Sequence, residues 1–208
     1  MQIPYLDVLL RDMEEKDIDD DIRWNTVETA WGLWDAPWEM EEVFAAFDPE
    51  KYRAEQLAWI AKPKPDHRLS LELDAGGVHI GSVGSYCLDG HLEWKTLNAG
   101  EDPAGQRWAV GIDICESAYW GGGWGAKALT GYILYHLSAG YTDLYTQTWS
   151  GNTRMIRLAE KLGFRECRRL PGLRTVRGAV YDGLTFRLDR DAFARHSARL
   201  EKSAGHGS

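Results

Sequence analysis

The stretch that decides the fold is VGIDICESAYWGGGWGAKAL, residues Val110–Leu129. Its first part is apolar and β-prone, and a run of glycines then leads into a helix. Glycine has no Cβ, so the backbone here can approach a ligand closely and take positive φ angles. The first N–H groups of a helix lack partners within it, so a helix start favours an anion, usually phosphate. The segment therefore indicates either an anion-binding turn or a plain tight turn without a ligand.

Two well-known nucleotide-binding loops do not fit this segment. The P-loop needs a Lys followed by Ser or Thr at the helix start, but Trp124 and Gly125 follow Gly123. The dinucleotide fingerprint belongs to a βαβ unit, whereas the chain upstream is predicted to be an antiparallel meander. A nucleotide-phosphate binder of another fold stays as an alternative hypothesis.

Outward from this stretch, apolar periodicity predicts a mixture of strands and helices. Predicted helices cover residues 12–23, 49–61, 126–137, 152–162 and 190–202. Predicted strands cover residues 4–11, 68–73, 78–88, 91–97, 108–115, 143–149, 164–169 and 180–188, and a glycine- and arginine-bearing segment joins the last two. No repeat or linker divides the chain. We therefore expect one domain over residues 1–208, with residues 203–208 as a frayed tail.

Two motifs resemble those of the GNAT (N-acetyltransferase) superfamily. Residues Trp120–Gly125, WGGGWG, are similar to its cofactor motif (Gln/Arg)-x-x-Gly-x-(Gly/Ala), with a departure at the first position. Residues Asn152–Phe164, NTRMIRLAEKLGF, resemble the family's Asn-x7-Glu-Lys-x-Gly-Phe helix. The Tyr-Trp-Gly-x-Gly form and the ending Tyr181–Leu184 are similar to the ribosomal-protein N-terminal acetyltransferase (Rim) type. The resemblance is clear over residues 108–188.

The resemblance implies a fold and a cofactor. The fold is α/β (α+β): one domain with a central mixed, mostly antiparallel sheet of about seven strands, splayed in the middle and flanked by helices. The cofactor is acetyl-CoA, held where two central strands diverge, with its diphosphate on the glycine loop. The implied cofactor-binding residues are Ile114, Cys115, Trp120, Gly121, Gly122, Gly123, Trp124, Gly125, Ala126 and Asn152.

The resemblance also implies an enzyme that moves an acetyl group directly from the thioester to a primary amine in a ternary complex. The amine must be neutral to attack, so a base must take its proton. The candidate bases are Asp113, Glu116 and Glu93, although each can also be a solvated carboxylate. The oxyanion needs a donor, which we expect to be a backbone N–H near Ile114 or Cys115.

The usual acids of the family are missing from this chain. Where relatives often have Tyr and Ser, the helix that begins near Asn152 has Ala159 and Met155. A non-catalytic reading therefore stays open. In that reading, the chain is an acyl-CoA-binding or regulatory module of the same fold with little or no turnover.

Ten tryptophans are an unusual number for 208 residues. Aromatic faces bind cationic or apolar groups well. We expect Trp31, Trp34, Trp38 and Trp149 to bind the acceptor, a small-molecule amine or a protein N-terminus; the alternative is that they fill the core. We expect Trp24 and Trp59 to be buried in the hydrophobic core. The arginines 165, 168, 169, 174 and 177 are expected to be solvated, with an anion site as the alternative.

Composition excludes several classes of function. The formal net charge of −8 argues against nucleic acid as a partner. The three cysteines form no CxxC pair and the six histidines show no HxxxH spacing, so neither a disulfide framework nor a metal site is expected. No run approaches the ~20 apolar residues of a membrane span, and the N-terminus lacks signal-peptide features. We expect a cytoplasmic protein without a membrane partner, compatible with a homodimer.

Overall fold

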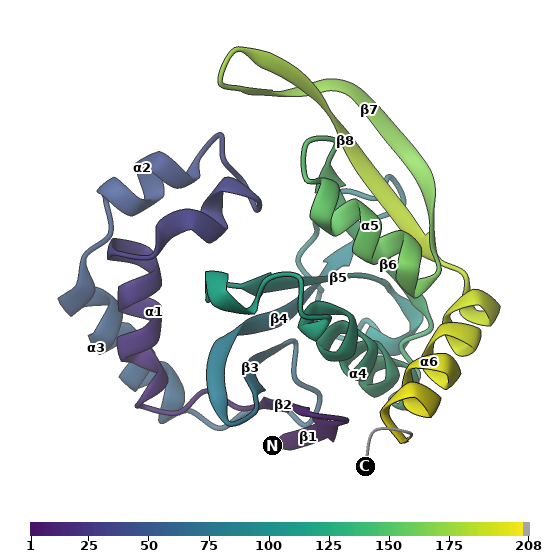
Figure 1. Ribbon diagram of the computed structural model, residues 1–208, viewed down its shortest axis with the longest axis horizontal. Coiled ribbons are helices and arrows are strands. Elements are labelled where there is room, and N and C mark those ends of the chain that lie inside the picture. The colour runs from purple at the N-terminus through teal and green to yellow at the C-terminus, as the bar shows by residue number, and fades with distance from the viewer. Residues whose placement is uncertain (206–208) are drawn as a thin grey trace.

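The structure is a computed structural model that describes residues 1–205. Its centre is one sheet of eight strands in the order β1-β2-β3-β4-β5-β6-β8-β7 (Figure 1). The strands are β1 (Gln2–Tyr5), β2 (Val8–Arg11), β3 (Ser70–Ala75), β4 (Val78–Leu88), β5 (Arg107–Ile114), β6 (Asp143–Trp149), β7 (Phe164–Val176) and β8 (Ala179–Leu188). The pair β5–β6 is parallel, and all other neighbouring pairs are antiparallel. The predicted mixed, mostly antiparallel sheet is confirmed, with eight strands instead of about seven.

The helices form two groups around the sheet. The N-terminal arm, residues 17–60, holds α1 (Asp17–Thr26), the 3-10 turn η1 (Thr29–Leu33), α2 (Met40–Ala45) and α3 (Pro49–Ile60). The second group is α4 (Trp124–Ser138), α5 (Thr153–Leu162) and α6 (Arg190–Gly205). Short 3-10 turns lie at η2 (Pro103–Gly105) and η3 (Ser117–Tyr119). Figure 1 shows the arm on one side of the sheet's central strands and the second group on the other. Among the described residues, the helices are too short or too polar to cross a membrane.

The sheet opens between β5 and β6. The two strands pair only over Arg107–Ala109 and Asp143–Tyr145. Beyond that point, β5 remains paired to β4 as far as Ile114, and β6 remains paired to β8 as far as Trp149. The facing edges of β5 and β6 therefore diverge, and their backbone groups there are not used by the sheet. This is the predicted splay.

Three predicted strands differ from the structure. Residues 4–11 form a hairpin, because Leu6 takes a φ of 53° and turns the chain between β1 and β2. Residues 91–97 form a loop with only a bridge between Leu88 and Trp94, because the Asp89 carboxylate accepts N–H bonds from the residues after it. The strand predicted to end at residue 169 continues to Val176, and a two-residue turn leads into β8.

The predictions for tryptophans and for the C-terminus were partly wrong. Trp24 is 2% exposed and lies in the core as expected, but Trp59 is 40% exposed and lies under the Lys64 ammonium, 3.3 Å from its ring centroid. Residues 203–205 continue α6 and do not fray. Residues 206–208 of the predicted tail lie outside the described residues.

Buried charges attach α1 to the sheet. The Arg11 guanidinium donates to Asp17 at the start of α1 and to Asp74 of β3, with N···O distances of 2.6–2.8 Å. Beside this pair, His79 of β4 contacts Glu72 through Nε2 at 3.1 Å and Asp20 through Nδ1 at 3.2 Å. These contacts fix the direction in which the arm leaves the sheet.

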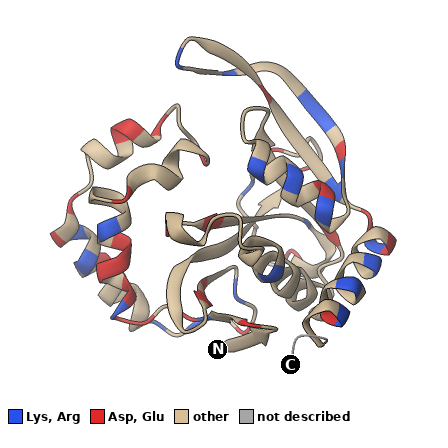
Figure 2. Cartoon of the chain, in the orientation of Figure 1, with Lys and Arg blue, Asp and Glu red and all other residues tan. Residues whose placement is uncertain are grey.

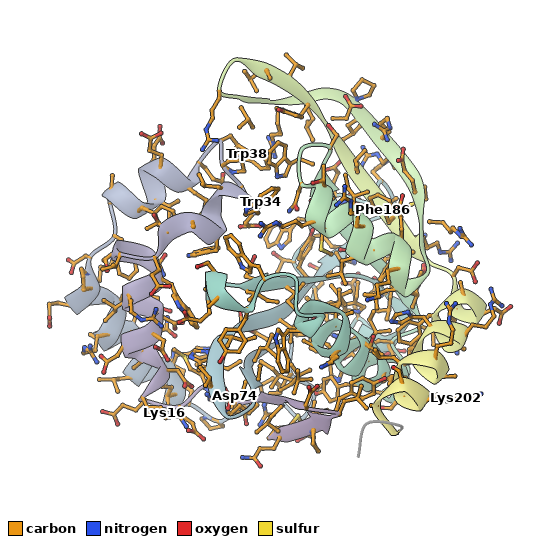
Figure 3. The ribbon with its side chains drawn as sticks, in the orientation of Figure 1. Lys16, Trp34, Trp38, Asp74, Phe186 and Lys202 are labelled. Atoms are coloured by element: carbon orange, nitrogen blue, oxygen red, sulfur yellow. The ribbon has the colours of Figure 1, made fainter. Side chains whose placement is uncertain are left out.

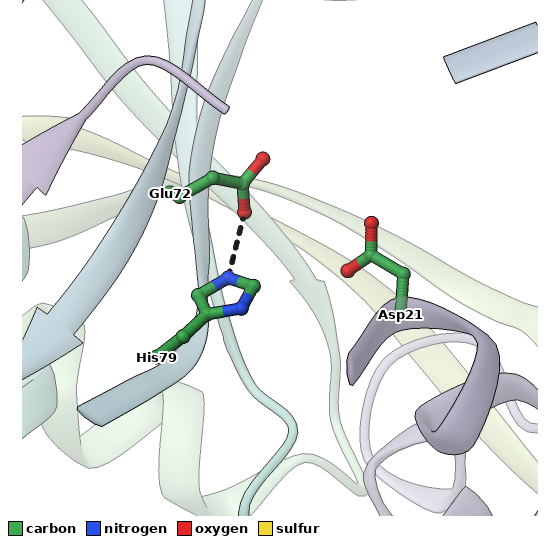
Figure 4. Close-up of side chains that lie close together, drawn as sticks. All are labelled: Asp21, Glu72 and His79. Atoms are coloured by element: carbon green, nitrogen blue, oxygen red, sulfur yellow. Dashed lines mark hydrogen bonds and ion pairs between the residues drawn. The ribbon is translucent and has the colours of Figure 1, made fainter. Parts of the chain in front are cut away.

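The Asp21 carboxylate of α1 faces this histidine (Figure 4). One oxygen or nitrogen atom from each of Asp21, Glu72 and His79 lies within 4.8 Å of the others, a spacing that would also suit a cation. The Tyr52 hydroxyl of α3 donates to Asp21 at 2.8 Å. A protonated His79 offsets one of the charges of the carboxylates Glu72, Asp20 and Asp21, and Arg23 pairs with Asp20 at 2.9 Å, so the cluster is a contact that holds the arm on the sheet.

We expect this cluster to make folding stability fall as pH rises from about 4 to about 7, and to fall further above the ordinary pKa of histidine. Burial, and then the Glu72 charge, raise the pKa of Asp21 to about 7. Burial opposes the charge of His79, but Glu72 outweighs it and raises the pKa of this imidazole. Both groups bind protons more tightly in the folded state. The contribution of Asp21 to folding stability is therefore lost as pH rises from the unfolded-state pKa of aspartate towards 7. The contribution of His79 is lost as pH rises above the ordinary pKa of histidine.

The measurement is the urea midpoint of the wild type and of Asp21→Asn at pH 5 and pH 8. The asparagine keeps an acceptor for Tyr52 and removes the charge. We expect the urea midpoint to fall less between pH 5 and pH 8 in Asp21→Asn than in the wild type. An equal fall in both proteins would contradict this account of the cluster.

Candidate active site

The glycine loop between β5 and α4 has the conformation of an anion cradle. Gly121 and Gly123 take φ angles of 84° and 82°, which side chains other than glycine rarely adopt. A Cβ on Gly122 would lie 2.7 Å from the indole nitrogen of Trp124, so this position also needs glycine. Gly123 is the N-cap of α4, and its carbonyl accepts the Ala126 and Lys127 N–H groups, so the N–H groups of Trp124 and Gly125 are the ones without an acceptor within the helix.

A cavity of about 860 Å³ lies at this loop and extends along the splay. It is bounded by β4, β5, β6, the start of α4, α5 and the η1 end of the arm. Of the predicted site residues, those that line it are Trp31, Trp34, Asp113, Ile114, Trp120, Gly121, Gly123, Trp124, Gly125, Ala126 and Asn152. The predicted residues that do not line it are Trp38, Glu93, Cys115, Glu116, Gly122 and Trp149.

The edge of β5 offers one free donor near its end. The Cys115 N–H donates to Ile80 of β4 at 2.8 Å, so it is not available to an oxyanion. The Ile114 carbonyl accepts from the indole of Trp120 at 2.7 Å, on the other side of the strand. Because the N–H and C=O of one strand residue point the same way, the Ile114 N–H also faces the splay. Cys115 is 7% exposed, and burial raises the pKa of its thiol, which stays protonated.

Two of the three predicted bases are committed to other partners. Glu116 accepts from the Arg23 guanidinium and from the indole of Trp24, the latter at 2.9 Å. Burial favours its neutral form, but Arg23 outweighs burial and lowers the pKa of Glu116. Glu93 pairs with Arg168 at 2.6 Å on a largely exposed surface. Neither reaches the large cavity, because each is held by an arginine that is distant in sequence.

Asp113 does reach the large cavity, and it faces a second carboxylate there. Asp35, from the arm segment after η1, lines the same cavity. Burial, and then the charge of Asp35, raise the pKa of Asp113 to about 7. Sequence reasoning missed Asp35. The only signal for it is its place between Trp34 and Trp38, in the segment expected to cover the acceptor.

A smaller cavity of about 280 Å³ adjoins the large one. The residues that line both are Asp35, Tyr86, Gln147 and Thr148. Two predicted acceptor residues, Trp38 and Trp149, line the smaller cavity, and so does Glu93. The acceptor tryptophans are therefore divided, with Trp31 and Trp34 at the large cavity and the other two at the small one.

The arm is fastened over the cavities by the backbone carbonyl of Trp34. This oxygen accepts from the Trp149 indole at 2.9 Å and from the Asn152 amide at 2.7 Å. Asn152 also caps α5 through its Oδ1, which accepts the Met155 N–H at 2.9 Å. Figure 3 shows Trp34 and Trp38 in the space between the arm and the part of the chain with α5 and β8. Asn152 therefore holds the arm, and its amide group is occupied by protein contacts.

Basic groups reach the large cavity from α5. Arg154 lies between the rings of Trp34 and Trp120, 4.3 and 4.2 Å from their centroids. Arg157 and Lys161 line the cavity on the same face of the helix. Neither has an ion-pair partner among residues 1–205. Figure 2 shows these basic residues gathered on α5.

The arginines that the sequence offered as an alternative anion site are used elsewhere. Arg165 pairs with Asp189, and Arg169 pairs with Glu166 and Asp182. Arg168 and Arg174 line the smaller cavity, where Arg174 lies 4.5 Å from the ring centroid of Trp38, and Arg177 forms the β7–β8 turn. The spacing i, i+3, i+7 from residue 154 was the signal that could have identified the basic face of α5.

Comparison with known proteins identifies the domain. The family model described as "Acetyltransferase (GNAT) domain" matches residues 7–165. Among curated proteins, no sequence match is found.

Solved structures share the fold at low sequence identity. A ribosomal-protein α-N-acetyltransferase, RimL, in complex with coenzyme A has a TM-score of 0.68 at 13% identity, over 90% of this chain and 97% of that one. An acetyltransferase of the GNAT family from Bacillus anthracis has a TM-score of 0.64 at 15% identity, over 90% and 98%. The yncA protein from Salmonella typhimurium, with its cofactor acetyl-CoA, has a TM-score of 0.60 at 19% identity, over 88% and 93%.

Proposed function

The chain belongs to the GNAT acetyltransferase family, and on that premise we propose that it is an N-acetyltransferase that moves the acetyl group of acetyl-CoA to a primary amine. The observation that carries the proposal is the large cavity, in which a phosphate cradle, a free strand edge and an uncompensated carboxylate meet. A phosphate binder that handles no acyl group would have no need of the strand edge and the carboxylate.

Successive parts of the large cavity carry groups that match the successive chemical parts of acetyl-CoA. The N–H groups of Trp124 and Gly125, at the start of α4, suit the diphosphate. The edge of β5 at Ile112 and the Ile114 N–H suit an amide-bearing chain that adds to the sheet like a strand, although the Ile114 carbonyl already accepts from Trp120. Arg157 and Lys161 suit a further phosphate. When bound, acetyl-CoA supplies the activated acyl group.

For the transfer itself, we assign roles to two groups on β5. The Asp113 carboxylate accepts the proton of the incoming ammonium, since its raised pKa keeps it a competent base near neutral pH. The Ile114 N–H, which faces the splay, donates to the oxygen on which negative charge develops. The transfer is direct, because the buried thiol of Cys115 lies outside the cavity and stays protonated.

The acceptor enters through the smaller cavity. Trp38 and Trp149 provide aromatic faces there, and Asp35 provides negative charge. Glu93 is paired with Arg168, and the Arg174 guanidinium lies 4.5 Å from the Trp38 ring centroid. The Asp35 carboxylate and the Trp149 ring favour a cationic amine. The RimL structure belongs to an enzyme that acetylates the α-amino group of a ribosomal protein, which supports a protein N-terminus as one acceptor class beside small amines.

One observation favours a second candidate, an acyl-CoA-binding module with little turnover. Ala159 is fully buried and Met155 lines the large cavity, so neither position provides the side-chain acid common among relatives. A single experiment separates the two candidates. Acetyl-CoA is mixed with a panel of peptides with free N-termini, diamines and aminoglycosides, and free thiol is measured beside acetyl-CoA affinity. We expect amine-dependent thiol release; tight binding with no release on any amine would favour the module.

We also expect the basic face of α5 to strengthen cofactor binding. The double variant Arg157→Ala/Lys161→Ala should weaken acetyl-CoA binding roughly tenfold, because two exposed charge pairs contribute about 0.5–1 kcal/mol each. The loss should shrink at high salt. Titration calorimetry measures it, with Arg165→Ala, outside the cavity, as the matched control. Equal affinities for the double variant and the control would contradict this placement.

A further inference from the structure

The smaller cavity holds charged side chains of both signs. Asp35 and Glu93 are acidic, and Arg168 and Arg174 are basic. Glu93 and Arg168 pair with each other at 2.6 Å. Within residues 1–205, the Asp35 carboxylate and the Arg174 guanidinium form no hydrogen bond and no ion pair. Both residues are exposed, so one negative and one positive group remain accessible to a ligand.

These two free charges lie on different walls of the cavity. Asp35 lies at the junction, because it lines the large cavity as well as the small one. Arg174 belongs to β7, and no residue of this strand lines the large cavity. A ligand in the smaller cavity therefore meets the carboxylate on the side of the splay and the guanidinium on the side away from it.

A bulge in β7 directs Arg174 at the cavity. Residues 171–173 of β7 lie opposite the single residue Asp182 of β8. The Asp182 carboxylate holds this bulge, because it accepts the Gly172 N–H at 3.0 Å. Neighbouring side chains of a regular strand point to opposite faces, but Leu173 and Arg174 both line the cavity. The strand is therefore shaped to bring this arginine to the cavity wall.

Arg174 leaves its hydrogen-bond donors free. Its guanidinium lies over the ring of Trp38, 4.5 Å from the centroid, and Trp38 meets Trp149 edge-on at 6.1 Å. The donors of a guanidinium lie in its plane, so contact with an indole face leaves them available to a carboxylate. The same contact occupies the Trp38 face, which a second cation on the acceptor would otherwise use.

We propose that the acceptor carries a carboxylate as well as its primary amine, and that Arg174 binds this carboxylate while the ammonium lies towards Asp35 at the junction. This inference rests on the proposed function and names the class of its acceptor. A free amino acid and a peptide with an acidic residue near its N-terminus share the required chemistry. A diamine lacks it, and its second cation would lie beside the Arg174 guanidinium.

The test compares pairs of amines that differ only in the carboxylate. One set contains ω-amino acids of increasing length and their primary amides. The other contains amidated peptides with a free N-terminus and either glutamate or glutamine as the second residue. Binding is measured by titration calorimetry with saturating coenzyme A, which has no acetyl group to transfer. We expect the carboxylate member to bind about five- to tenfold more tightly than its amide in one of the sets, which identifies the source.

Variants assign this preference to one residue. Arg174→Gln should remove the preference, and Arg174→Lys should retain part of it. The control Arg165→Gln makes the same change on the same strand outside both cavities and should retain all of it. Binding of the amide members should not change in any variant, as a distorted cavity would require. Equal affinities in every wild-type pair, no binding of any carboxylate member, or a preference that survives Arg174→Gln would overturn the inference.

A second readout follows activity with acetyl-CoA. Arg174→Gln should raise KM for the preferred acceptor about five- to tenfold with little change in kcat, because this residue contacts the acceptor and not the thioester. Thiol release that ignores the carboxylate would overturn the inference and leave the proposed function standing. A carboxylate preference in binding without thiol release on any amine would contradict the proposed function and leave the role of Arg174 standing.

Discussion

Replacement of Asp113 by asparagine is expected to lower kcat/KM for amine acetylation by about 10²-fold or more, at the scale of a lost general base. Asparagine preserves the size of the side chain but cannot accept a proton at neutral pH. Acetyl-CoA affinity should stay within about twofold of wild type, because the phosphate cradle begins at Gly121 and the basic face lies on α5. Steady-state kinetics with thiol detection and titration calorimetry measure the two quantities.

The matched control for this variant is Glu160→Gln, which makes the same chemical change on the exposed face of α5. Its kcat/KM should equal that of the wild type. If Asp113→Asn retains more than half of the wild-type kcat/KM, the base is another group and the assignment of Asp113 is wrong.

The second large effect is expected at Gly123. Alanine there must adopt a φ of 82°, in the left-handed region, at a cost of about 1–2 kcal/mol in stability. Gly77, in the β3–β4 turn far from the cavity, has a φ of 84°, and an added Cβ meets no atom within 4 Å at either position. The variants Gly123→Ala and Gly77→Ala therefore carry similar backbone strain, and only the first alters the cradle.

We expect Gly123→Ala to weaken acetyl-CoA binding by about tenfold to a hundredfold, since several N–H donors must shift together. Gly77→Ala should lose a similar amount of stability with no change in affinity. Thermal unfolding and calorimetry on both variants measure this. Equal affinities in the two variants would show that the loop does not hold the cofactor.

Local patterns were enough to predict the part of the fold that carries the loop. The apolar periodicity of α4 and α5 and the glycines that end or begin them act within a few residues, and these elements lie where the sequence placed them. The hairpin at Leu6 was missed because a leucine with positive φ has no signal in the sequence. The loop over residues 91–97 was missed because one carboxylate, Asp89, outweighs β-propensity there.

The site was harder to predict because its geometry comes from contacts between distant residues. Asp35 is positioned through its neighbour Trp34, whose carbonyl is held by side chains 115 and 118 residues further along the sequence than Trp34. Glu116 is removed from the list of bases by Arg23, 93 residues away. The cofactor loop lies within one stretch of chain and could be predicted, whereas the acceptor side is assembled from the arm, β4, β6, β7 and β8 and could not.

The most direct test of the central claim is a map of amide shifts in the ¹H–¹⁵N spectrum on addition of acetyl-CoA to the wild-type protein. If the splay between β5 and β6 is the cofactor site, the largest shifts will fall on Gly121–Gly125 and on Ile112 and Ile114, with smaller ones along α5. Saturating acetyl-CoA that leaves these amides unmoved, or that moves a different face of the molecule, would contradict the account.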